Sequence, residues 1–217
     1  MLLDSSKIYH ILCTERTGST LLYEYLINFN FKNFKNITRP RFALDGELFR
    51  PDILPLNEAL QYVRAELINN VHVIIKFMPA HLDEKYEKSF LSFYNQSPYC
   101  FLKLERKDKW RQLLSYLIAV YCHYDSIKTH EFARSKETIK FNNKIINEID
   151  NFKNKLKWFD NCKIDNYQNI YYEDLINNID PLSQGSYNLT YDNFSKINYE
   201  EKFENLNNIK EYFYDEE

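Results

Sequence analysis

Residues 11–22 read ILCTERTGSTLL, in which a short apolar run is followed by a polar loop and then by a new apolar pattern. The apolar run predicts a buried strand, and the spacing of apolar residues after Gly18 predicts a helix. Backbone N–H groups at a helix N-terminus lack intrahelical partners and carry the positive end of the helix dipole. Because such a loop binds anions, the stretch predicts a site for a phosphate or a sulfate-like group.

The side chains of this loop strengthen the prediction, since an arginine adds a fixed charge and three hydroxyls add donors. The expected anion-binding residues are Thr14, Arg16, Thr17, Gly18, Ser19 and Thr20. An ordinary helix cap is the alternative, but it gives no reason for an arginine at the apex of the loop. A nucleoside-triphosphatase loop has the pattern G-x-x-x-x-G-K-[ST], and residues 11–22 lack its first glycine and its Gly-Lys pair.

The composition of the 217-residue chain favours a single domain over residues 1–217. A hydrophobic content of 44% can fill one α/β core, and only 3 glycines and 6 prolines argue against a loop-rich all-β protein. A net charge of -3 provides no broad basic surface, so nucleic acid is not an expected partner. No apolar run is long enough for a membrane span, and no secretory signal is evident. The four scattered cysteines indicate free thiols in the cytoplasm and no metal site.

Strand and helix patterns alternate along the chain. Strands are expected at residues 7–14, 71–77, 99–104 and 168–172. Helices are expected at residues 18–29, 57–69, 83–94, 108–124, 129–159, 173–178 and 205–213, and a loop at 183–193. This order predicts an α/β fold, P-loop-like, with three α/β/α layers around a mostly parallel central sheet. Ligands of such sheets bind at the carboxyl ends of the strands, where the Arg16 loop is expected.

A second candidate anion site follows the strand expected at residues 99–104. Residues 101–116 read FLKLERKDKWRQLLSY, so that Arg106 leaves the strand end and Ser115 lies within the next helix. A guanidinium offers a planar fork of donors to phosphate oxygens, and a serine hydroxyl adds a neutral donor. Lys107 could take the place of Arg106 in the same turn. Two anion sites at one sheet edge suggest a nucleotide with phosphates at both ends.

These two segments resemble the cofactor motifs of sulfotransferases that use 3′-phosphoadenosine 5′-phosphosulfate (PAPS). Residues 14–20 fit T-x-R-[ST]-G-[ST]-T, and residues 104–115 fit L-x-R-x-D-K-x-x-Q-x-x-S of the bacterial carbohydrate branch, which includes trehalose 2-sulfotransferase and NodH-like enzymes. Weaker matches follow at residues 76–78, 172–175 and 204–206, so the resemblance covers about residues 7–213. It implies transfer of a sulfuryl group from PAPS to a hydroxyl of a small molecule or glycan, such as a carbohydrate or glycolipid. Members of that branch are often dimers, so a homodimer is one candidate assembly, and the oligomeric state stays open.

The resemblance also implies a catalytic base. Residues 45–49 read DGELF, and Glu47 matches the acidic residue that removes the acceptor proton in the family. The chemistry is reasonable on its own, since a hydroxyl must lose its proton as it attacks sulfur. Asp45 and His81 are rival bases, and Lys76 is either a second cation near the sulfonate or a lysine at a strand end. Arg16 is expected to stabilise the charge that develops, which removes the need for a metal.

Two other functions stay open at this point. The chain could be a nucleotide-dependent kinase of the related P-loop topology, or a nucleotide- or sugar-binding module without turnover. One departure from the family is that residues 183–194 contain no Arg or Lys, whereas the family often uses a basic loop there as a third cofactor contact. Arg134 or Lys196 is the candidate replacement.

Overall fold

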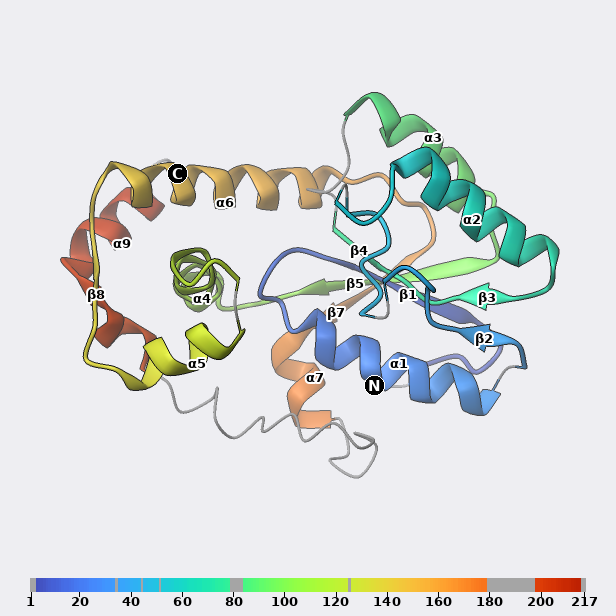
Figure 1. Ribbon diagram of the computed structural model, residues 1–217, viewed down its shortest axis with the longest axis horizontal. Helices are drawn as coiled ribbons and strands as arrows, with labels where there is room; N and C mark the ends of the chain where they lie inside the picture. Colours follow the sequence, from blue (N-terminus) through green and yellow to red (C-terminus); the bar gives the residue numbers. More distant parts are fainter. Residues whose placement is uncertain are drawn as a thin grey trace. The chain divides into compact units, whose positions relative to one another are not determined.

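The computed structural model describes residues 3–33, 35–43, 45–50, 52–78, 84–124, 126–178 and 198–215 (Figure 1). The chain divides into two compact units. The first contains Met1–Lys107 and Trp158–Tyr187, and the second contains Asp108–Lys157 and Asn188–Glu217. The single domain expected over residues 1–217 stays a prediction.

A four-stranded parallel sheet in the order β4-β1-β5-β7 forms the centre of the first unit. Its strands are β4 (Lys76–Phe77), β1 (Ile8–Cys13), β5 (Tyr99–Glu105) and β7 (Tyr167–Tyr171). Strand β1 is buried along its whole length, as expected for a strand covered on both faces. The predicted α/β class and the mostly parallel sheet are confirmed.

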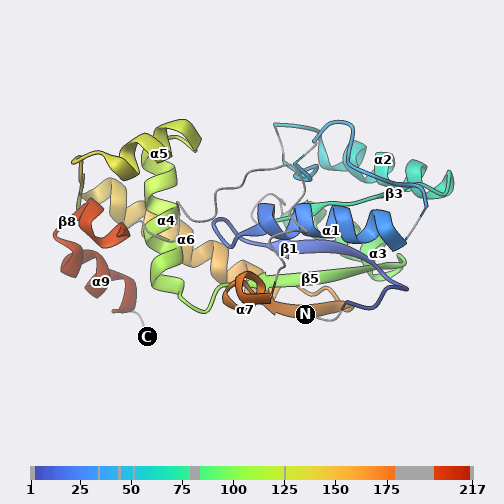
Figure 2. The ribbon, with the colours of Figure 1, turned by 90° about the horizontal axis from the view of Figure 1, so that it is seen from below.

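Helices cover both faces of this sheet. Figures 1 and 2 show α1 (Ser19–Asn33) and α7 (Tyr172–Asn178) on one side, and α2 (Leu56–Ile68) and α3 (Glu84–Asn95) on the other. The three layers agree with the prediction from the alternating pattern. Because all four strands are parallel, their carboxyl ends meet at one edge, where the loop after β1 begins.

The single strand predicted at residues 71–77 is wrong, because the segment forms two short strands. Strand β3 (His72–Val73) pairs with β2 (Ile37–Thr38), while β4 pairs with β1. Between them, the Ile75 amide donates a 3.2 Å hydrogen bond to Nδ1 of His10, a side chain on β1. The buried imidazole of His10 thus accepts a backbone N–H between the two short strands. At this point the chain changes its pairing partner from β2 to β1.

The second unit contains α4 (Lys109–Tyr121), α5 (Ser126–Arg134), β6 (Ile139–Lys140), most of α6 (Asn143–Asn161), the 3₁₀ turn η3 (Tyr199–Lys202), β8 (Phe203–Glu204) and α9 (Leu206–Tyr214). The single helix predicted over residues 129–159 is wrong. The Ser135 hydroxyl donates to the Phe132 carbonyl at the end of α5, and the Asn142 side chain accepts from the first amides of α6. Strand β6 lies between these caps and pairs with β8, which no local pattern indicates.

The four cysteines are free thiols, as predicted, and Cys13, Cys100 and Cys122 are buried. Within the described ranges, no helix has both the length and the apolar character that a bilayer span requires. The loop predicted at residues 183–193 lies outside the described residues.

Candidate functional site: the loop after the first strand and the side chains around it

The loop at the carboxyl end of β1 consists of residues 14–18 and leads directly into α1. Arg16 and Gly18 have positive φ angles of 60° and 83°. Glycine adopts this region without strain, whereas a residue with a Cβ must be held there by its surroundings. The chain thus turns sharply from a buried strand into the N-terminus of a 15-residue helix, a geometry that suits an anion.

The hydroxyl side chains of this loop and of the first turn of α1 divide into two kinds. Thr14, Thr17 and Ser19 are buried, and the Thr17 hydroxyl donates a 2.8 Å hydrogen bond to the Thr14 carbonyl. Thr20 is exposed, and its Oγ1 lies 3.5 Å from Nζ of Lys76. Thr17 therefore braces the loop from inside, and Thr20 is the hydroxyl that a ligand can reach.

Arg106 reaches the loop from the end of β5. Its Nη1 donates a 3.2 Å hydrogen bond to the Arg16 carbonyl, across 90 positions of sequence. Its guanidinium lies over the ring of Tyr172 at 4.7 Å from the ring centre, and Oε1 of Glu173 lies 3.9 Å from its Nε. The structure therefore brings the side chain of Arg106, from the second motif, to the backbone of Arg16 in the first motif.

Lys107, the alternative to Arg106, lies in a different environment. Its ammonium is 2.7 Å from the Asp174 carboxylate and 4.9 Å from the ring centre of Tyr171. About half of the side chain is exposed. Of the two neighbouring cations, Arg106 is the one that contacts the loop.

Glu47 is paired with Lys76 at the same loop. Nζ of Lys76 lies 2.9 Å from Oε1 of Glu47 and 3.5 Å from Oγ1 of Thr20. The lysine side chain is 2% exposed and that of Glu47 is 17% exposed, while Arg50 lies 3.6 Å from the other carboxylate oxygen. A carboxylate, a buried ammonium and a loop hydroxyl therefore form one connected group.

The other two candidate bases are placed differently. Asp45 is exposed, and its Oδ1 accepts the Glu47 amide hydrogen at 3.1 Å, so it shapes the turn around Gly46. His81 lies outside the described residues. Of these candidates, Glu47 is the one whose carboxylate is shown beside a cation of the sheet edge.

The remaining sequence-predicted residues lie in the second unit or outside the described chain. Ser115 is buried on α4, and Arg134 is exposed at the end of α5. Lys196 lies outside the described residues. The roles of Ser115 and Arg134 toward a nucleotide stay predictions.

Two tyrosines that no sequence pattern indicated pack against the glycines of the site. A Cβ added to Gly18 would lie 2.4 Å from the Tyr172 ring, and one added to Gly46 would lie 2.4 Å from the Tyr23 ring. The Lys76 ammonium lies 5.8 Å from the centre of the Tyr23 ring. Each glycine thus packs on an aromatic ring that also carries a cation. The scarcity of glycine in the chain was the signal for close packing, but nothing in the sequence pointed to the partner rings.

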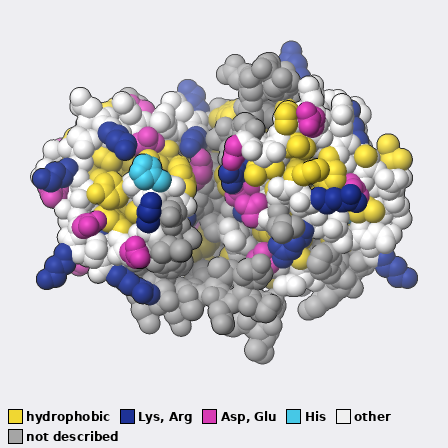
Figure 3. Space-filling model, in the orientation of Figure 1, with side chains coloured by type: hydrophobic (Ala, Val, Ile, Leu, Met, Phe, Trp, Pro, Cys, Tyr) yellow, Lys and Arg dark blue, Asp and Glu magenta, His cyan; other side chains and the backbone are white. Residues whose placement is uncertain are grey.

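A cysteine, the possible metal ligands and the surface charge of the described residues offer little competing chemistry. Burial raises the pKa of the Cys13 thiol to about 12, so this cysteine beside the loop is a poor nucleophile. Within the described ranges, no group of three His, Cys, Asp or Glu side chains is arranged to hold a metal. On the face seen in Figure 3, described basic and acidic side chains are interspersed, consistent with the small net charge of -3.

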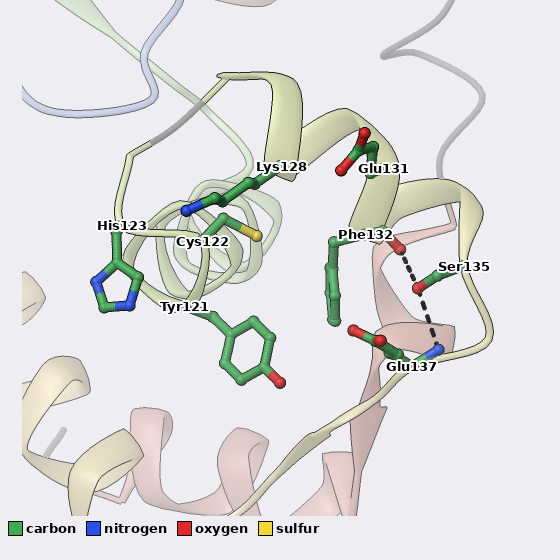
Figure 4. A pocket seen from close by; sticks show the side chains of 8 residues that line it. All are labelled: Tyr121, Cys122, His123, Lys128, Glu131, Phe132, Ser135 and Glu137. Atoms are coloured by element: carbon green, nitrogen blue, oxygen red, sulfur yellow. Dashed lines mark hydrogen bonds between the residues drawn. The ribbon is translucent and has the colours of Figure 1, made fainter.

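A pocket of about 270 Å³ lies in the second unit, between the end of α4 and α5. Figure 4 shows the rings of Tyr121 and Phe132 flanking it, with their centroids 5.0 Å apart. The Ser135 hydroxyl at its edge is engaged with the backbone of Phe132 and Glu137. None of the expected catalytic or cofactor-binding residues lines this pocket.

No family model, no curated protein and no solved structure matches this chain. The function is therefore inferred from the loop after β1 and from the three charged side chains, Glu47, Lys76 and Arg106, that surround it.

Proposed function

We propose that the protein is a PAPS-dependent sulfotransferase that moves a sulfuryl group to a hydroxyl acceptor, such as that of a carbohydrate or glycolipid. The convergence of three charged side chains on one helix-initiating loop carries the proposal. Arg106 bonds the loop backbone, and Lys76 joins the Glu47 carboxylate to the Thr20 hydroxyl. Transfer of a sulfuryl group needs both an anion cradle and a nearby proton acceptor, and these residues offer both.

The residues present fit a doubly phosphorylated adenosine donor. The first amides of α1 lack intrahelical partners, and Gly18 lets the loop turn sharply, with a φ of 83°, against the Tyr172 ring. The Arg106 Nε is buried and finds no hydrogen-bond acceptor among the described residues. Such a donor is satisfied by a bound anion. In this proposal residues 16–20 hold the 5′-phosphosulfate and Arg106 holds the 3′-phosphate.

The chain's own residues then have distinct tasks. PAPS supplies, when bound, a sulfuryl group on a phosphate leaving group. Glu47 accepts the proton of the acceptor hydroxyl as the new oxygen–sulfur bond forms and the sulfur–oxygen bond to phosphate breaks. The electron pair of that bond stays on the phosphate oxygen. Arg16, the loop amides and Lys76 can oppose this negative charge, and preorganised donors of this kind lower barriers by several kcal/mol.

The first test measures binding. Thermal unfolding is followed with adenosine 3′,5′-bisphosphate in EDTA, and separately with Mg-ATP. The proposal expects stabilisation by the bisphosphate without magnesium, because the cations of the site belong to the protein. Stabilisation by Mg-ATP alone overturns it in favour of a kinase, and no response to either nucleotide overturns it outright.

The second test measures turnover. The protein is incubated with PAPS and a panel of hydroxylated metabolites and glycans, and sulfated products are detected by mass spectrometry. Glu47→Gln keeps an oxygen that Lys76 can contact, so bisphosphate binding should persist while turnover falls by about 10²–10⁴-fold. Asp45→Asn is the matched control and should keep its turnover. If the bisphosphate binds and yet no acceptor is sulfated, the chain is a binding module instead.

A further inference from the structure

We infer that Tyr172 is a positioning residue for the anion loop: its ring forms the wall for Gly18 and the platform on which Arg106 lies. The inference deepens the proposed function and rests on it for the nature of the ligand. Tyr172 is the first residue of α7 and follows directly on β7, so the ring is anchored at the same sheet edge as the loop.

The first contact joins Tyr172 to the loop. An ideal Cβ on Gly18 would come within 2.4 Å of both Cδ2 and Cε2 of the ring. Real Cβ atoms do not approach carbon atoms this closely, so the ring and the Gly18 backbone are already in close contact. The ring therefore limits how far the loop can move toward β7.

The second contact joins Tyr172 to Arg106. The guanidinium carbon lies 4.7 Å from the ring centre, within the range of a cation–π interaction. The same guanidinium donates from Nη1 to the Arg16 carbonyl at 3.2 Å, and its side chain is only 12% exposed. With one face on the ring and one edge on the loop backbone, Arg106 has little freedom to turn.

These contacts together make one rigid assembly from segments that are distant in sequence. Gly18 lies on the ring, Arg106 lies on the ring, and Arg106 also holds the carbonyl of Arg16. The Arg106 Nε is thereby fixed without a hydrogen bond to a described residue, with the Glu173 carboxylate at 3.9 Å. Preorganised donors bind anions more strongly because less conformational freedom is lost on binding.

The preceding residue, Tyr171, provides a matched control. Tyr171 carries the Lys107 ammonium at 4.9 Å from its ring centre, and Lys107 is paired with Asp174. Tyr171 and Tyr172 are thus neighbouring tyrosines with similar cation contacts, but Tyr172 is the one that touches Gly18. A general effect of losing an aromatic ring near β7 is expected from both, whereas loss of positioning is expected from Tyr172 alone.

The first experiment needs no ligand. The Nε–Hε resonance of Arg106 is assigned by NMR in the wild-type chain, Tyr172→Phe, Tyr172→Leu and Tyr171→Leu. The aromatic ring should shift this resonance in the wild type and in Tyr172→Phe, and the shift should vanish in Tyr172→Leu alone. An unchanged resonance in Tyr172→Leu overturns the inference. If Tyr172→Leu does not fold, Tyr172→Met is used in its place, because its longer and more flexible side chain can adapt to the space of the ring.

The second experiment measures the Kd of adenosine 3′,5′-bisphosphate by calorimetry. Tyr172→Leu should weaken binding about 10-fold, whereas Tyr172→Phe and Tyr171→Leu should stay within about 2-fold of wild type. Equal losses in the Phe and Leu variants overturn the inference, because the hydroxyl and not the ring is then responsible. If the wild type does not bind the bisphosphate, the proposed function fails, and the NMR result still decides the positioning role of Tyr172.

Discussion

Gly18 and Gly46 occupy comparable places in the first unit. Their φ angles are 83° and 88°, and a Cβ added to either would lie 2.4 Å from a tyrosine ring. The rings differ, because Tyr23, beside Gly46, is fully buried, whereas Tyr172, beside Gly18, is partly exposed. Gly46 therefore packs on a ring of the buried core, and Gly18 packs on a ring at the surface.

The cations on these two rings differ in the same way. Near Tyr23, Lys76 is 2.9 Å from Glu47 and Arg39 is 2.7 Å from Glu24. Over Tyr172, the buried Nε of Arg106 forms no hydrogen bond to a described residue, and the Glu173 carboxylate lies 3.9 Å from it. The comparison teaches that the same packing of a glycine on a tyrosine ring occurs in two settings. Beside Gly46 the cations form short ion pairs, whereas beside Gly18 the Arg106 Nε donates to no described residue, and in the proposed function that donor binds the nucleotide.

The largest expected effect on stability distinguishes the buried ring of Tyr23 from the partly exposed ring of Tyr172. Gly46→Ala should lower the free energy of unfolding by about 3 kcal/mol, since a left-handed alanine is strained and the buried Tyr23 ring cannot move aside. Gly18→Ala should cost about 1–2 kcal/mol, because the ring of Tyr172 can shift toward solvent. Urea unfolding of both variants measures the difference. Equal losses of unfolding free energy would mean that the exposure of the neighbouring tyrosine ring does not matter.

The next effect tests the ion pair between Glu47 and Lys76. Glu47→Ala leaves the ammonium of Lys76, which is 2% exposed, without its carboxylate. Breaking a fully buried pair costs about 3–5 kcal/mol, and the remaining Thr20 contact and the partial exposure of Glu47 reduce the expected loss to about 2 kcal/mol. Urea unfolding of this variant gives the loss directly.

Arg50→Ala is the control for this pair. Its guanidinium lies 3.6 Å from the same carboxylate but its side chain is 36% exposed. An exposed ion pair contributes less than about 1 kcal/mol. A loss from Arg50→Ala as large as that from Glu47→Ala would contradict the assignment of Lys76 as the main partner.

Acid should lower the stability of the first unit, because β1 carries the buried His10. Burial lowers the pKa of His10 from 6.5 to about 3, and this imidazole accepts the Ile75 amide next to Lys76. Between these two pKa values the unfolded chain binds a proton that the folded chain does not, so stability falls as the pH falls through this window. The expected slope from His10 is at most about 1.4 kcal/mol per pH unit.

The groups that face His10 are His72, whose pKa burial also lowers, and the phenols of Tyr94 and Tyr99, whose pKa values burial raises. His72 acts in the same direction, so His10 must be isolated by substitution. His10→Asn keeps an acceptor and should flatten the pH dependence of unfolding between pH 6.5 and pH 4. His123→Asn, at an exposed position, should leave the slope unchanged. An unaltered slope in His10→Asn would refute the assignment.

The loop after β1 and the parallel order of the sheet could be predicted because their signals are local, an apolar run followed by a glycine-containing loop and a helical period. The break between β3 and β4 could not, since it depends on an imidazole 65 positions away from Ile75. Likewise, Ile139 reads as part of a helix until β6 pairs with Phe203 of β8. The same reasoning applies to the site: Glu47, Arg16 and Arg106 stand in recognisable patterns, whereas Tyr23 and Tyr172 gain their role only through packing.

The smallest expected effect lies at the position next to Arg106. Lys107→Ala removes an exposed ammonium paired with Asp174, and exposed pairs contribute little, so neither the urea midpoint nor the Kd of adenosine 3′,5′-bisphosphate should change measurably. Arg106→Ala should weaken that ligand by about 10-fold or more, as a charged hydrogen-bond donor to phosphate is lost. It should weaken adenosine 5′-phosphosulfate less, because that nucleotide has no 3′-phosphate. Equal losses for the two nucleotides would place Arg106 at the phosphosulfate position, where both of them carry a 5′-phosphate group, and would leave the 3′-phosphate to other residues. The hydrogen bond from the guanidinium to the Arg16 carbonyl is compatible with either position.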